Sequence, residues 1–365
     1  MALVQLKERL DGSPGLHALV IGIGDYPHGK AAGLPSITSP VVSAKAMAEW
    51  LIAERKSSKC ELATLDVLLS GGTFEHKGVV SDGATVDEVI RAVYDLRGRA
   101  RVGDHILLYV AGHGATDSAS RSGVIFCSDT GQNEFQRYEN SIRIDSILEG
   151  MFECPASAQL FMFDTCRVDG NPSTRFAKAP FENTAFTPLG QQIAIFPGPV
   201  NSKASGKVGE QSIFVKAFLA SAKGEGCRLE GDSWTVRTSN LVVGMNSYLK
   251  KHHPGAPEVQ PEGYCEEFCV HETEEPPHVN CNVMCAPRST QANKQLEYHN
   301  ISLDPTITFP VRLPPVTDAN AWSLSLKAGI YTFKAINLVG EIVGQKMAYP
   351  IDPSTKTIHI EVSTE

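Results

Sequence analysis

The sequence lacks an apolar run long enough to cross a membrane, which takes roughly 18 to 20 residues. Its first apolar run, residues 16–23, is short and ends in glycines, with no small-residue cleavage site after it. We interpret this run as a buried strand and not as a signal peptide. These absences predict a cytoplasmic protein with no membrane partner.

Clusters of positive charge are missing as well. Lys and Arg number 33 against 41 Asp and Glu, so the formal net charge is −8, and no run of Lys or Arg stands out. Proteins that bind nucleic acid carry a basic patch for the phosphates, so we expect no nucleic-acid partner.

The sequence also lacks the signs of a secreted disulfide framework. The nine cysteines are an odd number and follow no secretion signal, which favours reduced thiols. The sequence contains neither internal repeats nor low-complexity segments. What it does contain is 42% hydrophobic residues over 365 positions, enough to bury a real core. The length suggests one large domain plus a small one, or two medium ones.

Up to about residue 272, short apolar runs alternate with segments of helical period. Buried parallel strands read as continuous apolar runs, so the alternation predicts an α/β fold with a mostly parallel six-stranded sheet and helices on both faces. We expect helices after Ser39-Pro40, after a capping box at Thr85, and over residues 211–222 and 241–250. The expected strands are residues 16–23, 65–69, 106–110, 160–163, 193–196 and 267–270.

The pattern changes after residue 272, which bounds a first domain at 1–272. Residues 273–300 contain Pro276-Pro277 and a stretch with cysteines, which we interpret as a linker or an insertion. Residues 301–365 hold short alternating or β-branched segments separated by turn residues. That pattern is typical of a small, sandwich-like β-rich domain.

Two of the predicted strands end in reactive residues. One strand runs into Ala111-Gly112-His113-Gly114, and another runs into Asp164-Thr165-Cys166-Arg167. In open α/β sheets, ligands bind at the carboxyl ends of the strands. Glycines allow close approach of a substrate to the histidine, and a charged, partly exposed setting distinguishes reactive cysteines from inert ones.

In this order and at a spacing of 53 positions, His113 and Cys166 resemble the catalytic pair of the caspase and metacaspase family of cysteine peptidases. The chain is most similar to the prokaryotic, caspase-like branch, over about residues 14–272. The resemblance implies a larger subdomain at about 14–170 and a smaller one at about 190–272. The motifs that carry it are residues 21–27, 103–104, 111–114, 163–167, 193–196 and 209–214.

The resemblance implies a role for each residue of the pair. Cys166 is expected to attack the peptide carbonyl as the nucleophile, and His113 to act as general base and then acid, protonating the leaving amine. The backbone N–H groups of Gly114 and Cys166 are expected to form the oxyanion hole. Arg167 is expected to be structural or to pair with an acid.

The residue two positions before the cysteine sets this chain apart from caspases, which carry Gln there and hold a substrate aspartate. This chain has Asp164, as metacaspases do, and an acid at the pocket floor favours Arg, and less well Lys, before the cleaved bond. Metacaspases often add an acid from the first helix region, where this chain has none at residues 41–44. Asp25 is the candidate to compensate, and a plain turn at Asp25-Tyr26 is the alternative.

The segment after the fourth strand is the expected place of regulation. Family members are commonly processed between the two subdomains, and residues 167–190 contain Arg175 and Lys178, which an Arg- or Lys-specific enzyme could cut in itself. The resemblance thus implies a stress or defence effector that is switched on by self-cleavage, by an activating protein or by an upstream protease. The sequence requires no cofactor, and calcium is expected only because many metacaspases need it.

Two Cys-x₃-Cys pairs lie near the domain boundary, Cys265 with Cys269 and Cys281 with Cys285. Four cysteines could bind zinc tetrahedrally, and unrelated free thiols are the alternative. The seven glutamates between residues 258 and 275 form either a solvated loop or a docking surface for basic substrate segments.

Two other classes of function stay open. A catalytically silent caspase-fold scaffold would bind a partner through its C-terminal β region, although the intact His113 and Cys166 count against it. A ligand-binding α/β protein would need a phosphate-type glycine loop, and Gly22-Ile23-Gly24 is too short a match to the dinucleotide fingerprint.

Overall fold

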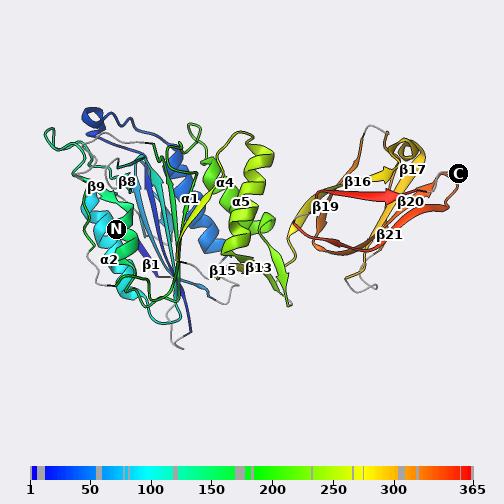
Figure 1. Cartoon of the computed structure of the whole chain (residues 1–365), viewed down its shortest axis with the longest axis horizontal. Helices are drawn as coiled ribbons and strands as arrows, with labels where there is room; N and C mark the ends of the chain where they lie inside the picture. Colours follow the sequence, from blue (N-terminus) through cyan, green and yellow to red (C-terminus); the bar gives the residue numbers. More distant parts are fainter. Residues whose placement is uncertain are drawn as a thin grey trace. The chain divides into compact units, whose positions relative to one another are not determined.

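The computed structural model divides the chain into two compact units (Figure 1). Unit 1 contains Met1–Ser221 and Val236–Glu272, and unit 2 contains Ala222–Thr235 and Thr273–Glu365. No helix in the described part of the chain is long and apolar enough to span a membrane. The structure describes residues 2–5, 13–54, 60–76, 79–80, 83–117, 122–168, 177–181, 185–231, 233–264, 267–273, 275–302, 309–317, 320–353 and 355–362.

The main sheet of unit 1 contains, in chain order, β1 (Ala2–Gln5), β2 (Leu16–Ile23), β3 (Leu62–Ser70), β6 (His105–Gly112), β10 (Ala158–Thr165), β11 (Gln191–Phe196) and β14 (Gln260–Tyr264). Their order across the sheet is β1-β3-β2-β6-β10-β11-β14. The five central strands run parallel, and each edge strand is antiparallel to its neighbour. Every residue of β2, β3 and β10 is buried because both faces of the sheet are covered, which is why these segments read as continuous apolar runs.

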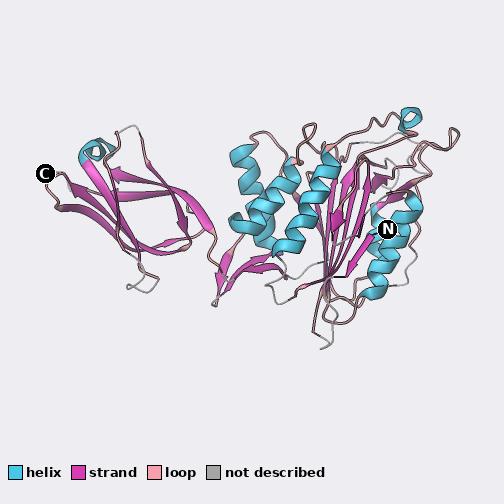
Figure 2. Ribbon diagram, turned by 180° about the vertical axis from the view of Figure 1, so that it is seen from behind, coloured by secondary structure: helices cyan, strands magenta, loops and turns pink. Residues whose placement is uncertain are grey.

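The α-helices described in unit 1 are α1 (Ser39–Glu54), α2 (Val86–Arg99), α3 (Ile144–Gly150), α4 (Ile213–Ala220) and α5 (Thr238–His252). α1, α4 and α5 cover one face of the sheet and α2 covers the other (Figure 1, Figure 2). The capping box predicted at Thr85 is present, because Thr85 caps the Glu88 backbone N–H and the Glu88 carboxylate accepts the Thr85 backbone N–H at 2.9 Å. The predicted helix start at Ser39 is also confirmed.

The predicted α/β class with a mostly parallel sheet is confirmed, and the edges of the sheet differ from the prediction. The segment predicted as a strand at 267–270 overlaps β15 (Cys269–Thr273), which lies outside the main sheet. The strand beside β11 is instead β14. β14 pairs on one side only and its other edge faces solvent, which is where polar strands are found. β1 adds a seventh strand from a segment of mixed polarity that carries no clear strand signal.

Shorter elements complete the two units. β7 (Gly114–Thr116), β8 (Gly123–Phe126) and β9 (Ser141–Arg143) form a three-stranded antiparallel sheet that begins directly after β6. The short elements are the 3-10 helix η1 (Gly29–Ala32), β4 (Glu75–His76), β5 (Val79–Val80), β7 (Gly114–Thr116), β8 (Gly123–Phe126), β9 (Ser141–Arg143), the π-helical turn η3 (Ser221–Glu225), β12 (Arg228–Glu230) and β13 (Ser233–Arg237).

Two further β-sheets make up most of unit 2. One contains β16 (His278–Ala286), β19 (Trp322–Lys327) and β22 (Thr357–Glu361). The other contains β17 (Lys294–Asn300), β18 (Val311–Leu313), β20 (Gly329–Asn337) and β21 (Ile342–Ile351), and a 3-10 helix η4 (Arg288–Asn293) precedes β17.

The linker or insertion predicted at residues 273–300 is wrong, because β16 and β17 are both central strands of these sheets. Buried and exposed residues alternate along β16, and Cys281 and Cys285 lie on its buried face. Its period of two is present in the sequence, but cysteine and asparagine at alternate positions weaken the apolar signal.

Candidate active site

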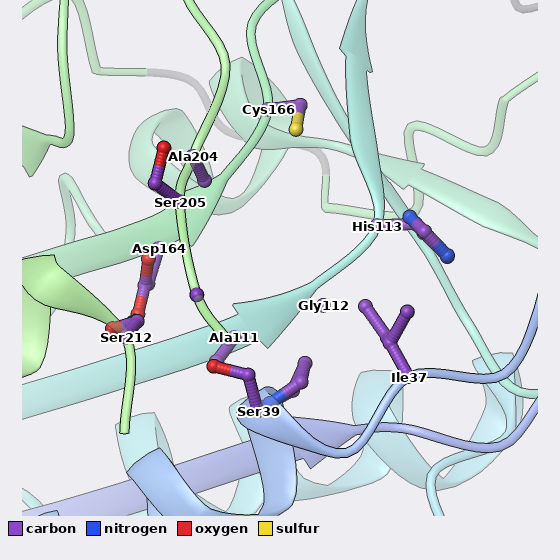
Figure 3. Close-up of a pocket in the computed structure, with 12 residues that line it drawn as sticks. Ile37, Ser39, Ala111, Gly112, His113, Asp164, Cys166, Ala204, Ser205 and Ser212 are labelled. Atoms are coloured by element: carbon purple, nitrogen blue, oxygen red, sulfur yellow. Dashed lines mark hydrogen bonds between the residues drawn. The ribbon is translucent and has the colours of Figure 1, made fainter. Parts of the chain in front are cut away.

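One pocket at the carboxyl edge of the main sheet holds His113, Cys166 and Asp164 together (Figure 3). Its volume is about 200 Å³. β6 and β10 pair in parallel up to Gly112 opposite Thr165, so the residues that follow the two strands emerge side by side. The described residues that line the pocket are Ile37, Ser39, Pro40, Ala111, Gly112, His113, Asp164, Cys166, Ala204, Ser205, Gly206 and Ser212.

The glycines on either side of His113 allow the two strand ends to pack closely. A Cβ atom on Gly114 would lie 2.7 Å from Cβ of Thr165, which is closer than real Cβ contacts come. A Cβ atom on Gly112 would lie 3.0 Å from the hydroxyl of Tyr26. The His-Gly and Asp-Thr-Cys motifs therefore form one packed unit, and glycine at position 114 is a steric requirement.

Three contacts fix the position of His113. Its backbone N–H donates to the Tyr26 hydroxyl at 2.8 Å, and the two rings lie 5.0 Å apart. Its Nε2 lies 2.8 Å from the carbonyl oxygen of Pro35, which can only accept, so Nε2 carries the proton. Neutral His113 then has Nδ1 free of a proton and able to act as a base.

Cys166 lies at the side of the pocket and is half-buried. Burial raises the pKa of its thiol, and the charge of Asp164 adds to this rise. A backbone hydrogen bond from Ala204 and the charge of Lys203 oppose it. In Figure 3 the ring of His113 points away from the thiol, so the resting arrangement favours a protonated sulfur.

Asp164 forms the floor of the pocket and is only 5% exposed. Its Oδ2 accepts hydrogen bonds from the Tyr109 hydroxyl, at 2.8 Å, and from the Ser212 hydroxyl. Burial raises the pKa of this carboxyl to about 6, and the two hydroxyls limit the rise. Asp164 is the one acid among the described lining residues, and none of them is Lys or Arg.

Arg167 has a structural role, as the sequence predicts. Its side chain is buried, lies 4.1 Å above the ring of Phe196 and forms an ion pair with Glu262 of β14 at 2.7 Å. Its backbone exchanges hydrogen bonds with Asn201 and Ser202. Arg167 thus attaches the end of β10 to the loop that continues into the pocket wall at Ala204.

Asp25 is not among the lining residues of the pocket. Its Oδ1 accepts a hydrogen bond from Ser36 at 2.7 Å, and its backbone N–H donates to the Ser70 carbonyl. These contacts hold it in the turn after β2, so the alternative reading as a turn describes it better than a substrate-binding role.

Several residues of the site were not identified from the sequence. Ser212 carries a readable signal, a serine before an apolar helix, and it caps α4 by accepting the Val215 backbone N–H. Tyr109 also carries one, since a buried tyrosine hydroxyl inside an apolar run needs a partner. Pro35 has no such signal because it acts through its backbone carbonyl.

The family model of the caspase domain matches residues 16–262. The chain belongs to the caspase-domain family of cysteine peptidases. This confirms the resemblance carried by the His113 and Cys166 motifs, and the match includes every described lining residue of the pocket.

Other comparisons add little to this assignment. A crystal structure of a protein from Geobacter sulfurreducens is similar over 71% of this chain and 94% of its own length, with a TM-score of 0.45 and 15% sequence identity. No curated protein matches the sequence.

The possible self-cleavage sites of this caspase domain lie in the segment after Cys166. Arg175 is outside the described residues. Lys178 is paired in parallel with the strand β9, because its N–H donates to Ser141 at 2.8 Å and its carbonyl accepts from Arg143 at 3.0 Å. A protease binds the cleaved segment as an extended, unpaired strand, so Lys178 is not available in this conformation.

The geometry of the cysteines does not suit the four-cysteine zinc site. Cys281 and Cys285 are four positions apart on β16, which at about 3.4 Å per residue places them about 14 Å apart. Zinc–sulfur bonds are about 2.3 Å long, so the two thiols cannot share one ion. Cys265 lies outside the described residues, and the residues that are described contain no group of three or more His, Cys, Asp or Glu placed to hold a metal.

Proposed function

We propose that this caspase domain is an endopeptidase that cleaves proteins after Arg and, less well, after Lys. The observation that carries the proposal is that a histidine, a thiol and a single buried carboxylate, His113, Cys166 and Asp164, line one pocket. A thiol and an imidazole in one pocket are the groups that covalent acyl transfer requires, a nucleophile and a base. A lone carboxylate at the pocket floor favours a substrate cation.

The proposed reaction begins with transfer of the thiol proton to Nδ1 of His113, the nitrogen that Pro35 does not occupy. The sulfur of Cys166 bonds to the substrate carbonyl carbon, and the carbonyl electron pair moves to oxygen, where the N–H groups of Gly114 and Cys166 stabilise it. Nδ1–H protonates the leaving amine as the C–N bond breaks. Water then hydrolyses the thioester and restores the thiol.

The resting positions of the two groups support regulation as part of the proposal. The ring of His113 must turn toward Cys166 before the thiol can lose its proton to it. A ring that points away from the thiol at rest fits a stress or defence effector that is switched on by self-cleavage, by an activating protein or by an upstream protease. A dependence on calcium rests on family resemblance alone, and assays with added calcium or a chelator test it directly.

Cys166→Ala should abolish hydrolysis because it removes the nucleophile. His113→Ala should lower kcat/KM by at least about 10²-fold, since proton transfer typically contributes that much to the rate. The assay is kcat/KM on peptides that differ only in having Arg, Lys, Asp or Leu before the bond, with thermal melting to verify folding. Cys281→Ala, which removes a buried thiol from unit 2, is the matched control and should keep full activity.

A catalytically silent scaffold is the alternative, and the direction of the His113 ring, which points away from the thiol, is the observation in its favour. It predicts no turnover of any peptide under any condition and no effect of Cys166→Ala. Hydrolysis that survives in purified Cys166→Ala would contradict both readings.

A further inference from the structure

Behind the pocket floor lies a closed group of three hydroxyls that the proposed reaction does not use. Tyr109 comes from β6, Ser43 from α1 and Ser212 from the residue before α4. All three are buried, Tyr109 and Ser43 completely. Tyr109 and Ser212 both donate to one oxygen atom, Oδ2 of Asp164, and Ser43 lies behind them.

The direction of each hydrogen bond in this group is fixed by its partners. Oδ2 accepts from the hydroxyls of Tyr109 and Ser212. The Ser212 backbone N–H donates to the Ser43 oxygen at 2.8 Å, and Ser43 lowers the pKa of Tyr109, so it lies close to that hydroxyl as well. The hydroxyl protons of Tyr109 and Ser212 therefore both point at Asp164, an arrangement that fits a negatively charged carboxylate.

The other carboxylate oxygen is available to a substrate. Oδ1 of Asp164 has no hydrogen-bond donor among the residues that the structure describes, and Asp164 lines the pocket. Figure 3 shows its side chain beside Ser212 at the pocket wall. A guanidinium fork that engages both oxygens would have to displace one of the two hydroxyls from Oδ2.

We propose that Tyr109 and Ser212 are specificity-determining residues that hold Asp164 charged and present it to the substrate through Oδ1 alone. The inference rests on the proposed function of the pocket as the site for a substrate cation. It predicts that the preference for Arg over Lys is smaller than a two-oxygen contact would give, because one oxygen serves an ammonium nearly as well as a guanidinium.

Titration of Asp164 depends on a small set of neighbours. β6 contributes Tyr109 and, beyond its end, His113, while Cys166 follows β10 and Lys203 acts on Cys166. The start of α4 faces Asp164 with Ser212, behind which lies Ser43 of α1, and neither serine titrates. Among described residues, burial and the two hydroxyls set the pKa of this carboxyl, which lies near 6.

The first test separates Asp164 from the His113–Cys166 pair. The kcat/KM for a peptide with Arg is divided by the kcat/KM for the same peptide with citrulline, the neutral isostere of Arg. Titration of the His113–Cys166 pair affects both peptides equally and cancels, so the pH dependence of this ratio reports the titration of Asp164. Tyr109→Phe removes one donor to the carboxylate, so the pH midpoint of this ratio should rise by about one unit. Above both midpoints, the freed lone pair on Oδ2 should raise the Arg-to-Lys ratio about fivefold.

Tyr94→Phe is the matched control. Tyr94 lies on α2, its hydroxyl donates to the carbonyl oxygen of Pro180, and it does not line the pocket. It should leave both ratios unchanged. Ser43→Ala is the second variant if Tyr109→Phe fails to fold, and it should shift the midpoint in the same direction by less. An unchanged midpoint in a folded Tyr109→Phe protein would overturn the proposal.

A second measurement decides the hydroxyl group without any turnover. The difference in melting temperature between the parent and Asp164→Asn, measured as a function of pH, reports the pH at which Asp164 ionises. The midpoint of this pH dependence should move upward when both proteins also carry Tyr109→Phe. If no peptide is cleaved at all, the proposed function fails, while this titration still supports or overturns the role of the hydroxyls.

Discussion

Tyr26 shows how much of the site depends on one hydroxyl. It is 4% exposed, accepts the backbone N–H of His113 at 2.8 Å and packs its ring 5.0 Å from the imidazole. The hydroxyl is also 3.0 Å from where a Cβ atom on Gly112 would lie. Tyr26 is thus a positioning residue for His113, although the sequence indicates only a turn there.

Tyr26→Phe should lower kcat about tenfold to 100-fold and leave KM nearly unchanged. The change keeps the ring and leaves the His113 N–H without its acceptor, which costs about 1 to 3 kcal/mol and misplaces the imidazole. Tyr331→Phe, which removes a hydroxyl from unit 2, is the control. Equal kcat in the two variants would show that Tyr26 only fills space.

Asp164→Asn should slow cleavage after Arg by about 30-fold or more and stabilise the fold at neutral pH. The pKa of Asp164 is raised from 3.8 to about 6, so the folded protein binds this proton more tightly than the unfolded chain. The free energy of unfolding is therefore highest below pH 3.8 and falls until about pH 6, by about 3 kcal/mol in total. The loss of activity corresponds to removing one partner of a buried charge pair.

Melting curves of parent and Asp164→Asn between pH 3.5 and 8 check the stability, and kcat/KM on matched Arg peptides checks the activity. The two proteins should melt alike at the acid end and diverge as the pH rises. A variant that is less stable than the parent at pH 7 would mean that the charge of Asp164 supports the fold.

At the scale of the elements, the site depends on how closely the ends of β6 and β10 approach. Their parallel register places Gly112 opposite Thr165, and the following residues turn into β7 and into the Cys166 loop. Gly114, the first residue of β7, packs against Thr165, so the spacing of the strand ends is set by a missing side chain.

Gly114→Ala should destabilise the fold by about 1 to 3 kcal/mol and abolish activity, because its Cβ atom would press on Thr165 and separate the two ends. Gly98→Ala is the matched control. A Cβ atom there meets nothing within 4 Å, and alanine in the helix α2 should add about 0.5 to 1 kcal/mol. Thermal melting and peptide turnover of both variants provide the measurement.

At the scale of the whole molecule, the pocket and the core beneath it belong to unit 1. All seven strands of the main sheet end before residue 265, and the large buried cluster under the pocket includes Leu19, Leu108 and Phe163. The sheets of unit 2 have their own buried residues, Phe333 and Ile360 among them. Each unit therefore has the apolar interior that a fold requires.

A chain truncated after residue 272 should keep its kcat/KM on small peptides to within about threefold, because truncation removes no residue of the main sheet or the pocket. Circular dichroism and size-exclusion chromatography check folding, and the peptide assay checks the site. A folded but inactive truncation would place a requirement for the reaction in residues 273–365.

The sequence by itself determines the scaffold and the reactive pair. Continuous apolar runs at residues 16–23 and 160–163 mark buried parallel strands because burial on both faces leaves no polar side to alternate with. His113 and Cys166 can be read from the ends of such runs, since the carboxyl ends of neighbouring parallel strands must meet at one edge. The same reasoning does not predict β14. This edge strand pairs on one side only and is polar, so it has no apolar run to mark it.

Tertiary structure alone decides how the pocket is charged and oriented. Tyr109, Ser43 and Ser212 are far apart in the chain, and only the packing of the elements that carry them brings the hydroxyls of Tyr109 and Ser212 to Asp164 and places Ser43 beside Ser212. The Pro35 carbonyl determines which nitrogen of His113 carries the proton. Every residue has such a carbonyl, so the sequence does not indicate this role. Local pattern reports which residues are buried, whereas the direction of a hydrogen bond depends on partners that only the fold supplies.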